Sequence, residues 1–385
     1  MDELVPLPRL PEPERLTAVG RDVLILNWRD LTHPEGGGSE LYVENLAARL
    51  ARGGDRVTLF CADHGHAPRD EVKHGVHYVR RGSHATVYLW AWVLMLTGKL
   101  GRRGAVLEVH NGVPFLARLF TRRRVVVLVH HVHREQWGVV FGPTVARFGW
   151  WLESWLAPRV NRRCAYIAVS EVTKAELVGL GVAGSRISVV HNGTNPALPT
   201  YNPRAATPTI AVLGRLVPHK RVELVLEAAA ELRLDLPELQ VEIAGDGYWM
   251  AALRDRIEQL GLTSVVHLRG RVSEQEKAEL LARAWVHAVP SLKEGWGLSV
   301  VEAGSHGTPS VAFRQAGGLA ESILDGRSGS LVDDQPEFVA ELRSLLLNRA
   351  RREQLGAGAR EQAARFTWAA TAAGCAAVLG QSAGA

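Results

Sequence analysis

Cysteine is scarce in this chain: three occur among 385 residues, Cys61, Cys164 and Cys375. They lie far apart, their number is odd, and no Cys-x-x-Cys pair is present. Secreted disulfide frameworks and cysteine-based zinc sites both need paired or closely spaced cysteines. We therefore expect a protein of a reducing compartment, the cytoplasm, with neither feature.

Long apolar runs are also missing. The longest, TVYLWAWVLMLTG from Thr86, is well short of the roughly 20 residues that a membrane-spanning helix needs, so it is predicted to be a core helix. Residues 1–20 are acidic and proline-rich and lack the basic start and apolar core of a signal peptide. They are expected to form a flexible leader.

No run of basic residues exceeds three, yet charge is unevenly distributed. Residues 1–195 carry 25 Lys+Arg against 18 Asp+Glu, a net +7, and the remainder carries 20 against 22, a net −2, which together give +5. The basic half also holds seven of the eleven tryptophans. One interpretation, favoured by the short runs, is solvated arginines at strand and helix ends. The other is an anionic partner, for which we expect peripheral contact with the inner membrane face and no nucleic acid.

Short β-branched runs alternate with amphipathic helical patterns, which predicts parallel sheets covered by helices on both faces. A segment with four prolines and no periodicity, from Asn192 to Thr209, separates two such halves. We predict an α/β protein of two Rossmann-like domains facing a cleft. The domains are expected at residues 21–195 and 209–365, joined by a linker over 196–208.

Charges and glycines follow the strands predicted in the second half, where open α/β sheets bind ligands. Arg215 and Lys220 share one loop before a helix, which suits a diphosphate because helix N–H groups add to the two cations. The stretch EGWGLSVVEAGSHG places Glu294 before a glycine turn and Glu302 in the next helix, where carboxylates suit hydroxyls. The alternative to a ligand site is that Arg215 and Lys220 are solvated surface cations and that Glu302 forms a structural pair. Gly245 either lets the backbone approach a ligand or turns the chain.

The first half has two comparable features. Three glycines, 36–38, precede a helix beginning at Ser39 and suggest close approach to a phosphate or substrate, with a hinge as the alternative. His130, His131 and His133 end a predicted strand without an HxxxH pattern or an acidic cluster. One substrate-binding histidine with two bystanders is therefore favoured over a metal site.

These stretches together resemble family 4 of the retaining glycosyltransferases, which have the GT-B fold. The resemblance spans about residues 21–370 and rests on EGWGLSVVEAGSHGTPSVA, GRLVPHKR, AGDGYWM, HLRGRVSEQEKAELLARA and HPEGGGSELYVENLAARLARGGDRVTLF. It implies that residues 366–385 form a helix that crosses back to the first domain.

The resemblance also implies roles for individual residues. Arg215 and Lys220 would bind the donor diphosphate, Glu294 would contact hydroxyls of the transferred sugar, and Glu302 the ribose. The other residues implied are, for the donor, Gly37, Gly38, Gly245, Gly297, Leu298, Ser299 and His130, and, on the acceptor side, Asn111, His131 and His133. Because His130-His131 stands where relatives often have His-Asp, either imidazole is a candidate to face the donor sugar.

The implied activity is transfer of a hexose, with retention, from a UDP- or GDP-sugar to a hydroxyl of a glycan, a lipid-linked sugar or a natural product. No Asp-x-Asp motif occurs, so neither a metal nor another cofactor is expected. A sugar-nucleotide-binding protein without turnover is the main alternative. An NAD-dependent oxidoreductase is disfavoured because neither domain begins with Gly-x-Gly-x-x-Gly.

Overall fold

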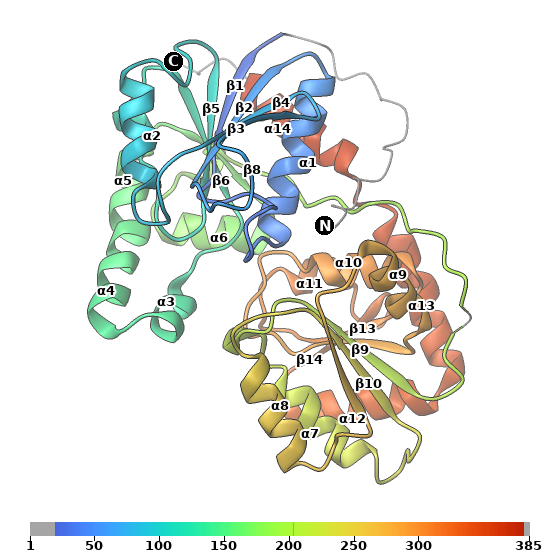
Figure 1. Cartoon of the computed structure of the whole chain (residues 1–385). Coiled ribbons are helices and arrows are strands. Elements are labelled where there is room, and N and C mark those ends of the chain that lie inside the picture. Colours follow the sequence, from blue (N-terminus) through green and yellow to red (C-terminus); the bar gives the residue numbers. More distant parts are fainter. Residues whose placement is uncertain (1–19, 203, 381–385) are drawn as a thin grey trace. The chain divides into compact units, whose positions relative to one another are not determined.

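The computed structural model describes residues 20–202 and 204–380, which divide into two compact units (Figure 1). The N unit contains residues 20–193 and 367–380, and the C unit is Thr194–Phe366. The leader expected over residues 1–20 lies outside the described residues except for its last one. Each unit is a Rossmann-like α/β layer structure, which confirms the predicted fold class.

The N unit is built on an eight-stranded sheet in the order β3-β4-β2-β1-β5-β6-β7-β8. All neighbouring strands are parallel except β3, which runs antiparallel to β4. The strands are β1 (Asp22–Leu26), β2 (Arg56–Cys61), β3 (Asp70–Lys73), β4 (Val76–Arg80), β5 (Ala105–His110), β6 (Arg124–Val129), β7 (Ala165–Ala168) and β8 (Ile187–Val189).

Edge strand β3 was not predicted. Its sequence, DEVK, has none of the apolar character on which the strand predictions rested. A two-residue turn of His74 and Gly75, with φ of 53° and 77°, joins it to β4, and such left-handed turns match the twist of a hairpin. The polar edge strand is thus specified by its turn and its partner.

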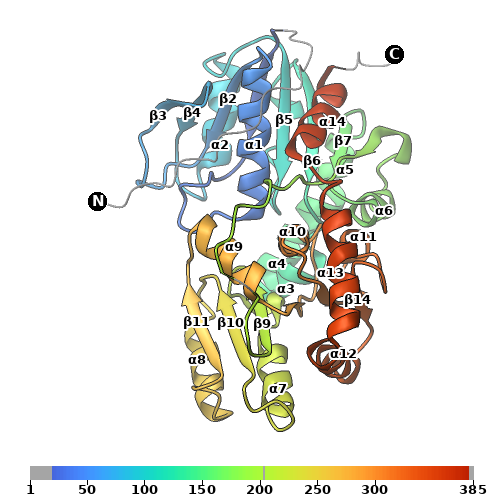
Figure 2. The ribbon, with the colours of Figure 1, turned by 90° about the vertical axis from the view of Figure 1, so that its right-hand side faces the viewer.

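Helices cover both faces of this sheet (Figures 1 and 2). Helices α1 and α14 pack against each other on one face, and α2 and α4 contribute to the apolar core on the other. The helical elements are α1 (Gly38–Arg52), α2 (Val87–Leu96), η1 (Ala117–Leu119), α3 (Arg134–Val140), α4 (Pro143–Trp151), the π-helical η2 (Leu152–Leu156), α5 (Ala157–Val160), α6 (Glu171–Gly179), η3 (Gly184–Arg186) and α14 (Trp368–Gly380).

Helix α2 corrects one expectation. It is the predicted core helix, but only one side of it is buried, and Leu89, Trp90, Val93 and Leu96 are 43–65% exposed. The run is apolar all round, so its pattern did not distinguish the side that packs on the sheet. Among the described residues, no helix is both long enough and apolar enough to cross a membrane.

The C unit has a six-stranded, wholly parallel sheet in the order β11-β10-β9-β12-β13-β14. Its strands are β9 (Thr209–Leu213), β10 (Gln240–Ala244), β11 (Val266–Gly270), β12 (Val286–Val289), β13 (Ser310–Phe313) and β14 (Gly329–Val332). Its helical elements are η4 (Pro218–Lys220), α7 (Glu223–Leu232), α8 (Met250–Gln259), α9 (Glu274–Arg283), α10 (Leu298–Ser305), α11 (Leu319–Ser322), α12 (Gln335–Leu347) and α13 (Arg349–Ala363).

The segment expected as a linker is attached to the C unit. The Ala205 N–H donates to the carbonyl of Arg283 at 2.9 Å, and the Trp285 indole donates to the carbonyl of Ala205 at 2.7 Å. The chain passes between the units at 193/194 and again at 366/367, and the Thr194 N–H donates to the carbonyl of Phe366 at 3.1 Å. The two passages therefore lie beside each other.

Candidate functional site

In the C unit, the strand order reverses between β9 and β12, and the loops that follow these two strands meet. Lys220 ends η4 after β9, Glu294 follows β12, and the Lys220 ammonium is hydrogen bonded to Glu294 Oε1. The Ser291 hydroxyl donates to the same oxygen at 2.7 Å. Burial alone would raise the pKa of Glu294, but Lys220 and Ser291 hold it below its ordinary value. The carboxylate is therefore ionised, and it lies where α/β sheets bind ligands.

The backbone around Glu294 is held by the loop after β13. The Glu294 N–H donates to the carbonyl of Ala316, and the Gly318 N–H donates to the carbonyl of Glu294, both at 2.9 Å. A Cβ at Gly317 would lie 2.7 Å from Glu294 O, and one at Gly318 would lie 2.2 Å from Gly295 O. This Gly-Gly pair was not predicted to belong to the site. Its position, shortly after a buried strand, would have indicated it.

Arg221 is a second residue that the sequence analysis missed. Its backbone is left-handed, with φ of 48°, and its guanidinium donates to the carbonyls of Pro290 at 2.8 Å and Ser291 at 3.1 Å. The same guanidinium lies 4.6 Å from the ring centroid of Phe313. Arg221 thus joins the loop that carries Lys220 to the loop that carries Glu294.

Helix α10 begins after Gly297, whose φ of 97° suits glycine and whose added Cβ would lie 2.5 Å from Leu319. Leu298 and Ser299 form its first turn, so their N–H groups belong to the unpaired end of the helix. A helix end of this kind can bind an anion, and it lies directly after the Gly-Trp-Gly turn that follows Glu294.

Glu302 lies further along α10 and has an unpredicted partner on α9. Lys277 Nζ lies 2.7 Å from Glu302 Oε1 and 2.9 Å from Glu274. Burial would lower the pKa of Lys277, yet the two carboxylates raise it above its ordinary value. Burial raises the pKa of Glu302, and Lys277 opposes that shift. Glu302 is thus a partly buried carboxylate whose ionised form is favoured by Lys277.

Gly245 serves close packing within the protein. Its φ is 143°, and an added Cβ would lie 1.8 Å from the carbonyl oxygen of Gly214. A Cβ at Gly247 would similarly lie 2.2 Å from the carbonyl oxygen of Leu216. These glycines allow the loop after β10 to pack closely against the loop that carries Arg215. The Arg215 side chain is exposed.

The N unit also has a point where strand order reverses, between β1 and β5. Asn111, after β5, donates through Nδ2 to Oδ1 of Asn27, after β1, at 3.2 Å. Asn27 in turn donates to the carbonyl of Arg29 at 2.8 Å. Asn111 was predicted on the acceptor side, and the structure shows that it bridges the two central strands.

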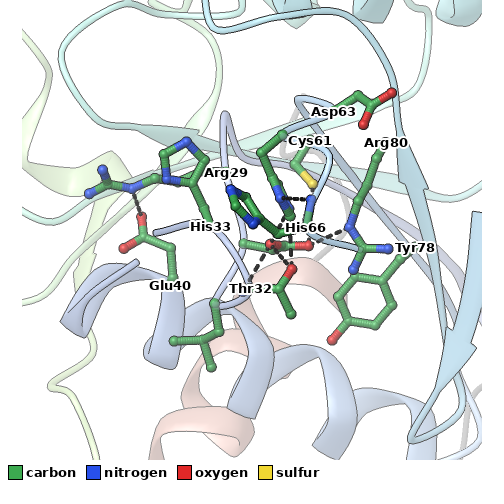
Figure 3. A network of polar contacts seen from close by, with 12 residues as sticks. Arg29, Thr32, His33, Glu40, Cys61, Asp63, His66, Tyr78 and Arg80 are labelled. Atoms are coloured by element: carbon green, nitrogen blue, oxygen red, sulfur yellow. Dashed lines mark hydrogen bonds and ion pairs between the residues drawn. The ribbon is translucent and has the colours of Figure 1, made fainter. Parts of the chain in front are cut away.

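The glycine loop between β1 and α1 is held by Glu40, which is fully buried. The Gly37 N–H donates to Glu40 Oε2 at 2.8 Å, and Arg29 Nε lies 3.1 Å from Glu40 Oε1 (Figure 3). Burial opposes ionisation, but Arg29, Ser39 and the Gly37 N–H hold the pKa of Glu40 below its ordinary value. The loop that ends in Gly37 and Gly38 is therefore a fixed element.

A second buried carboxylate, Asp30, fixes the start of the same loop (Figure 3). Arg80 Nε donates to Asp30 Oδ2 at 2.7 Å, and the Thr32 hydroxyl donates to Oδ1 at 2.7 Å. His64 Nε2 lies 3.1 Å from the same Oδ1. Arg80 ends β4 and His64 lies in the segment after β2, so two neighbouring strand ends hold this loop.

The three predicted histidines separate into different environments. His130 is 5% exposed, its ring contacts that of Tyr42 edge-on at 5.2 Å, and its Nε2 has no hydrogen-bond partner within residues 20–202 and 204–380. Burial lowers the pKa of His130 to about 4, so its imidazole is neutral. His131 pairs with Gln136 at 2.8 Å, and His133 pairs with Glu153 at 2.9 Å.

No group of three or more His, Cys, Asp or Glu side chains is placed to hold a metal ion in the part of the chain that the structure describes. The three cysteines are buried and free.

Two family models match this chain. The model described as Glycosyltransferase Family 4 matches residues 36–198, and the model described as Glycosyl transferases group 1 matches residues 200–362. D-inositol 3-phosphate glycosyltransferase of Nocardioides sp. is 35% identical over 234 residues, which are 54% of this chain and 51% of that protein. The chain thus spans about half the length of this relative. MMP alpha-(1->4)-mannosyltransferase of Mycolicibacterium hassiacum is 31% identical over 71% of this chain and 70% of that protein.

Solved structures share the fold. Sucrose-phosphate synthase from Thermosynechococcus elongatus superposes with a TM-score of 0.78 at 19% identity, covering 91% of this chain and 96% of that one. Anabaena Alr3699/HepE, solved in complex with UDP and glucose, has a TM-score of 0.74 at 19% identity and covers 93% of this chain and 99% of that one.

Proposed function

The chain belongs to glycosyltransferase family 4, and we propose that it transfers a hexose, with retention, from a nucleoside-diphosphate sugar to an acceptor hydroxyl. The observation that carries the proposal is the contact of Lys220 with the ionised Glu294 at the point where strand order reverses in the C unit. A cation for the diphosphate and a carboxylate for the sugar hydroxyls are thus already side by side.

Lys220 and Arg215 are assigned to the diphosphate. Both lie on the loop after β9, and the negative charge that develops on the departing phosphate is best offset by cations that are in place before reaction. The N-terminus of α10, at Gly297, Leu298 and Ser299, adds unpaired N–H groups to this charge. We propose that these groups perform the task for which other transferases use a divalent cation.

The two glutamates are assigned to opposite ends of the donor. Lys220 and Ser291 both engage Oε1 of Glu294, so Oε2 is proposed to accept hydrogen bonds from hydroxyls of the transferred sugar. Glu302, about one turn after the start of α10, is proposed to accept hydrogen bonds from the ribose, with Lys277 keeping it ionised. Each carboxylate thus has one lysine that maintains its charge.

The chemical step is proposed to occur on one face of the sugar. The bond from the anomeric carbon to the phosphate oxygen breaks, the bond to the acceptor oxygen forms, and the acceptor proton passes to the departing phosphate oxygen. No enzymatic nucleophile is needed in this scheme. His130, neutral and with an unpartnered Nε2, is proposed to lie beside the donor sugar.

Donor and acceptor classes follow from chemistry and from relatives. UDP and GDP are both candidate nucleotides, and UDP is the one present in the structure of Alr3699/HepE. Glycans, lipid-linked sugars and natural products are candidate acceptors. The names of the two relatives place a polyol phosphate first among the acceptors to screen and a mannosyl group first among the sugars to transfer.

Calorimetry and thermal shift with UDP, GDP and their sugar conjugates, without added metal, test the donor site. We expect selective binding of one diphosphate and a weaker affinity in Lys220→Ala. Glu294→Ala should abolish transfer and leave the fold intact, whereas Glu258→Ala, on the exposed side of α8, should change neither. Undiminished turnover in Glu294→Ala would refute the assignment, and nucleotide binding without any transfer would favour a non-catalytic binding protein.

A further inference from the structure

Helix α4 and η2 expose a row of large apolar side chains, called here the aromatic ridge: Val145, Phe148, Trp151 and Trp155. They are 54%, 59%, 42% and 44% exposed. Their spacing of three, three and four residues places them on one helical face. The rings of Phe148 and Trp151 are 5.9 Å apart, and those of Trp151 and Trp155 are 5.4 Å apart. The ridge is therefore continuous.

The opposite face of this helix is firmly packed. An added Cβ at Gly149 would lie 2.3 Å from the ring of Trp137, and the Trp137 indole donates to the buried Glu153 at 2.7 Å. Glu153 also binds His133 at 2.9 Å. The helix is anchored through that face, so the aromatic ridge is not needed to hold it in place.

Arginines surround the ridge. Five basic residues occur between residues 134 and 163, all of them exposed: Arg134, Arg147, Arg159, Arg162 and Arg163. The acidic residues of the same stretch are Glu135, which is exposed, and Glu153, which is buried. The Arg159 guanidinium lies 4.2 Å from the ring centroid of Trp155. The surface therefore combines exposed indoles with an excess of positive charge.

Helix α2 adds to this surface. It contributes to the same apolar core of the N unit as α4 (Figure 1), and four of its apolar residues are exposed. The largest exposures are 65% at Leu96 and 56% at Leu89, and exposed Lys99, Arg102 and Arg103 follow directly. Apolar and basic side chains thus recur together along one helical layer.

We propose that this layer, with the aromatic ridge as its main apolar element, docks on an anionic lipid bilayer as an interfacial surface. Tryptophan favours the headgroup region, where its ring is apolar and its N–H remains hydrated, and arginine binds lipid phosphates. A second copy of this chain is a poorer occupant because it would oppose the same arginines to each other. The phosphates of a nucleic acid would bind the arginines, but a nucleic acid would not bury the valine and leucine side chains.

Vesicle flotation with the full chain tests the proposal. Vesicles are made of phosphatidylcholine alone or with phosphatidylglycerol as a minor component. We expect binding to the anionic vesicles, weakening as salt rises, with a blue shift of tryptophan emission. The ridge variant Phe148→Ser/Trp151→Ser/Trp155→Ser should bind at least about tenfold more weakly because its apolar contribution is lost. The control Tyr201→Ser/Leu234→Ser/Leu347→Ser changes residues of the C unit that are more exposed than the ridge residues replaced, and it should bind as the wild type does.

Charge is tested separately. Arg147→Glu/Arg159→Glu should reduce partitioning to anionic vesicles by about tenfold or more, since each basic residue near such a surface contributes about fivefold. Arg254→Glu/Arg283→Glu, the matched reversal in the C unit, should have little effect. Circular dichroism and nucleotide affinity establish that each variant is folded. Equal binding by ridge and control variants would overturn the proposal. Self-association that the ridge variant abolishes, without vesicle binding, would overturn it in favour of a second copy.

Discussion

Lys277 of α9 reaches Glu302 of α10, and its Nζ lies 2.7 Å from Oε1 of that carboxylate. Burial raises the pKa of Glu302, so the lysine is what favours the ionised form. Lys277→Met should raise this pKa further and so increase the protonated fraction of Glu302 at a given pH. A protonated carboxyl is a poorer acceptor for ribose hydroxyls.

We therefore expect Lys277→Met to weaken nucleotide binding by about tenfold at neutral pH, as for the loss of one hydrogen bond to a charged group. Because the ionised form is populated above the pKa, raising the pH should restore affinity. Glu302→Gln is the control, since it should show a loss that does not vary with pH. Calorimetry at several pH values measures both, and a wild-type affinity in Lys277→Met would remove the lysine from the site.

Arg221→Ala should loosen the connection between the loops of Lys220 and Glu294. The substitution removes two hydrogen bonds to the carbonyls of Pro290 and Ser291 and the contact with Phe313. We expect a loss of about 2 kcal/mol in the free energy of unfolding, together with a raised KM for the donor. Urea denaturation and steady-state kinetics provide the two readouts. A stability loss with an unchanged KM would limit Arg221 to a structural role.

Gly245→Ala and Gly270→Ala separate backbone strain from steric overlap. Gly270 has φ of 66° and no heavy atom within 4 Å of an added Cβ, so alanine should cost about 1 kcal/mol of strain. At Gly245 the Cβ would also lie 1.8 Å from a backbone oxygen, so the loss should exceed about 4 kcal/mol. Melting temperatures of the two variants compare these costs. Equal shifts would contradict the close packing of the two loops.

The buried histidines predict an acid-sensitive stability. Burial lowers the pKa of His287 to about 4 from an ordinary 6.5, so between these values the unfolded chain takes up a proton that the folded chain does not. The free energy of unfolding therefore has its full value above pH 6.5 with respect to this histidine, and it decreases as the pH falls toward 4. The loss approaches about 3 kcal/mol. His287→Asn should flatten the pH dependence of the melting temperature, whereas the exposed His66→Asn should preserve it.

Much of the fold was predictable because its signals are local. The β-branched runs of both units predict strands without any knowledge of the elements that pack against them. The start of α9 is an example: Ser273 with Glu276 three residues later is a capping-box pattern, and the Glu276 carboxylate accepts the Ser273 N–H at 2.8 Å. The polar strand β3 and the exposed side of α2 were not predicted, because each depends on the neighbour against which the element packs.

The candidate site likewise combines residues that local motifs indicate with partners that they do not. Glu294, Lys220 and Glu302 lie in short motifs, and the structure places Glu294 against Lys220. Their further partners, Lys277 and Arg221, come from other elements, and no spacing along the chain reveals such a pairing. Gly245 was considered either as a ligand contact or as a turn, and the structure shows a third use, contact with Gly214. The substrate contacts of these residues are proposed from their chemistry.

Helix α14 has a consequence for how the protein is made. Although it follows the whole C unit in the chain, it belongs to the N unit, where Arg21 donates to the carbonyl of Ala376 at 3.0 Å and Arg124 donates to that of Val378 at 2.8 Å. The ribosome therefore synthesises the first 193 residues early, but their sheet lacks one covering helix until residues 367–380 emerge. The C unit, continuous in sequence, can complete its folding first. The half that is translated first is thus the half that matures last, and until then the part of its sheet face that α14 covers is the surface that a chaperone would recognise.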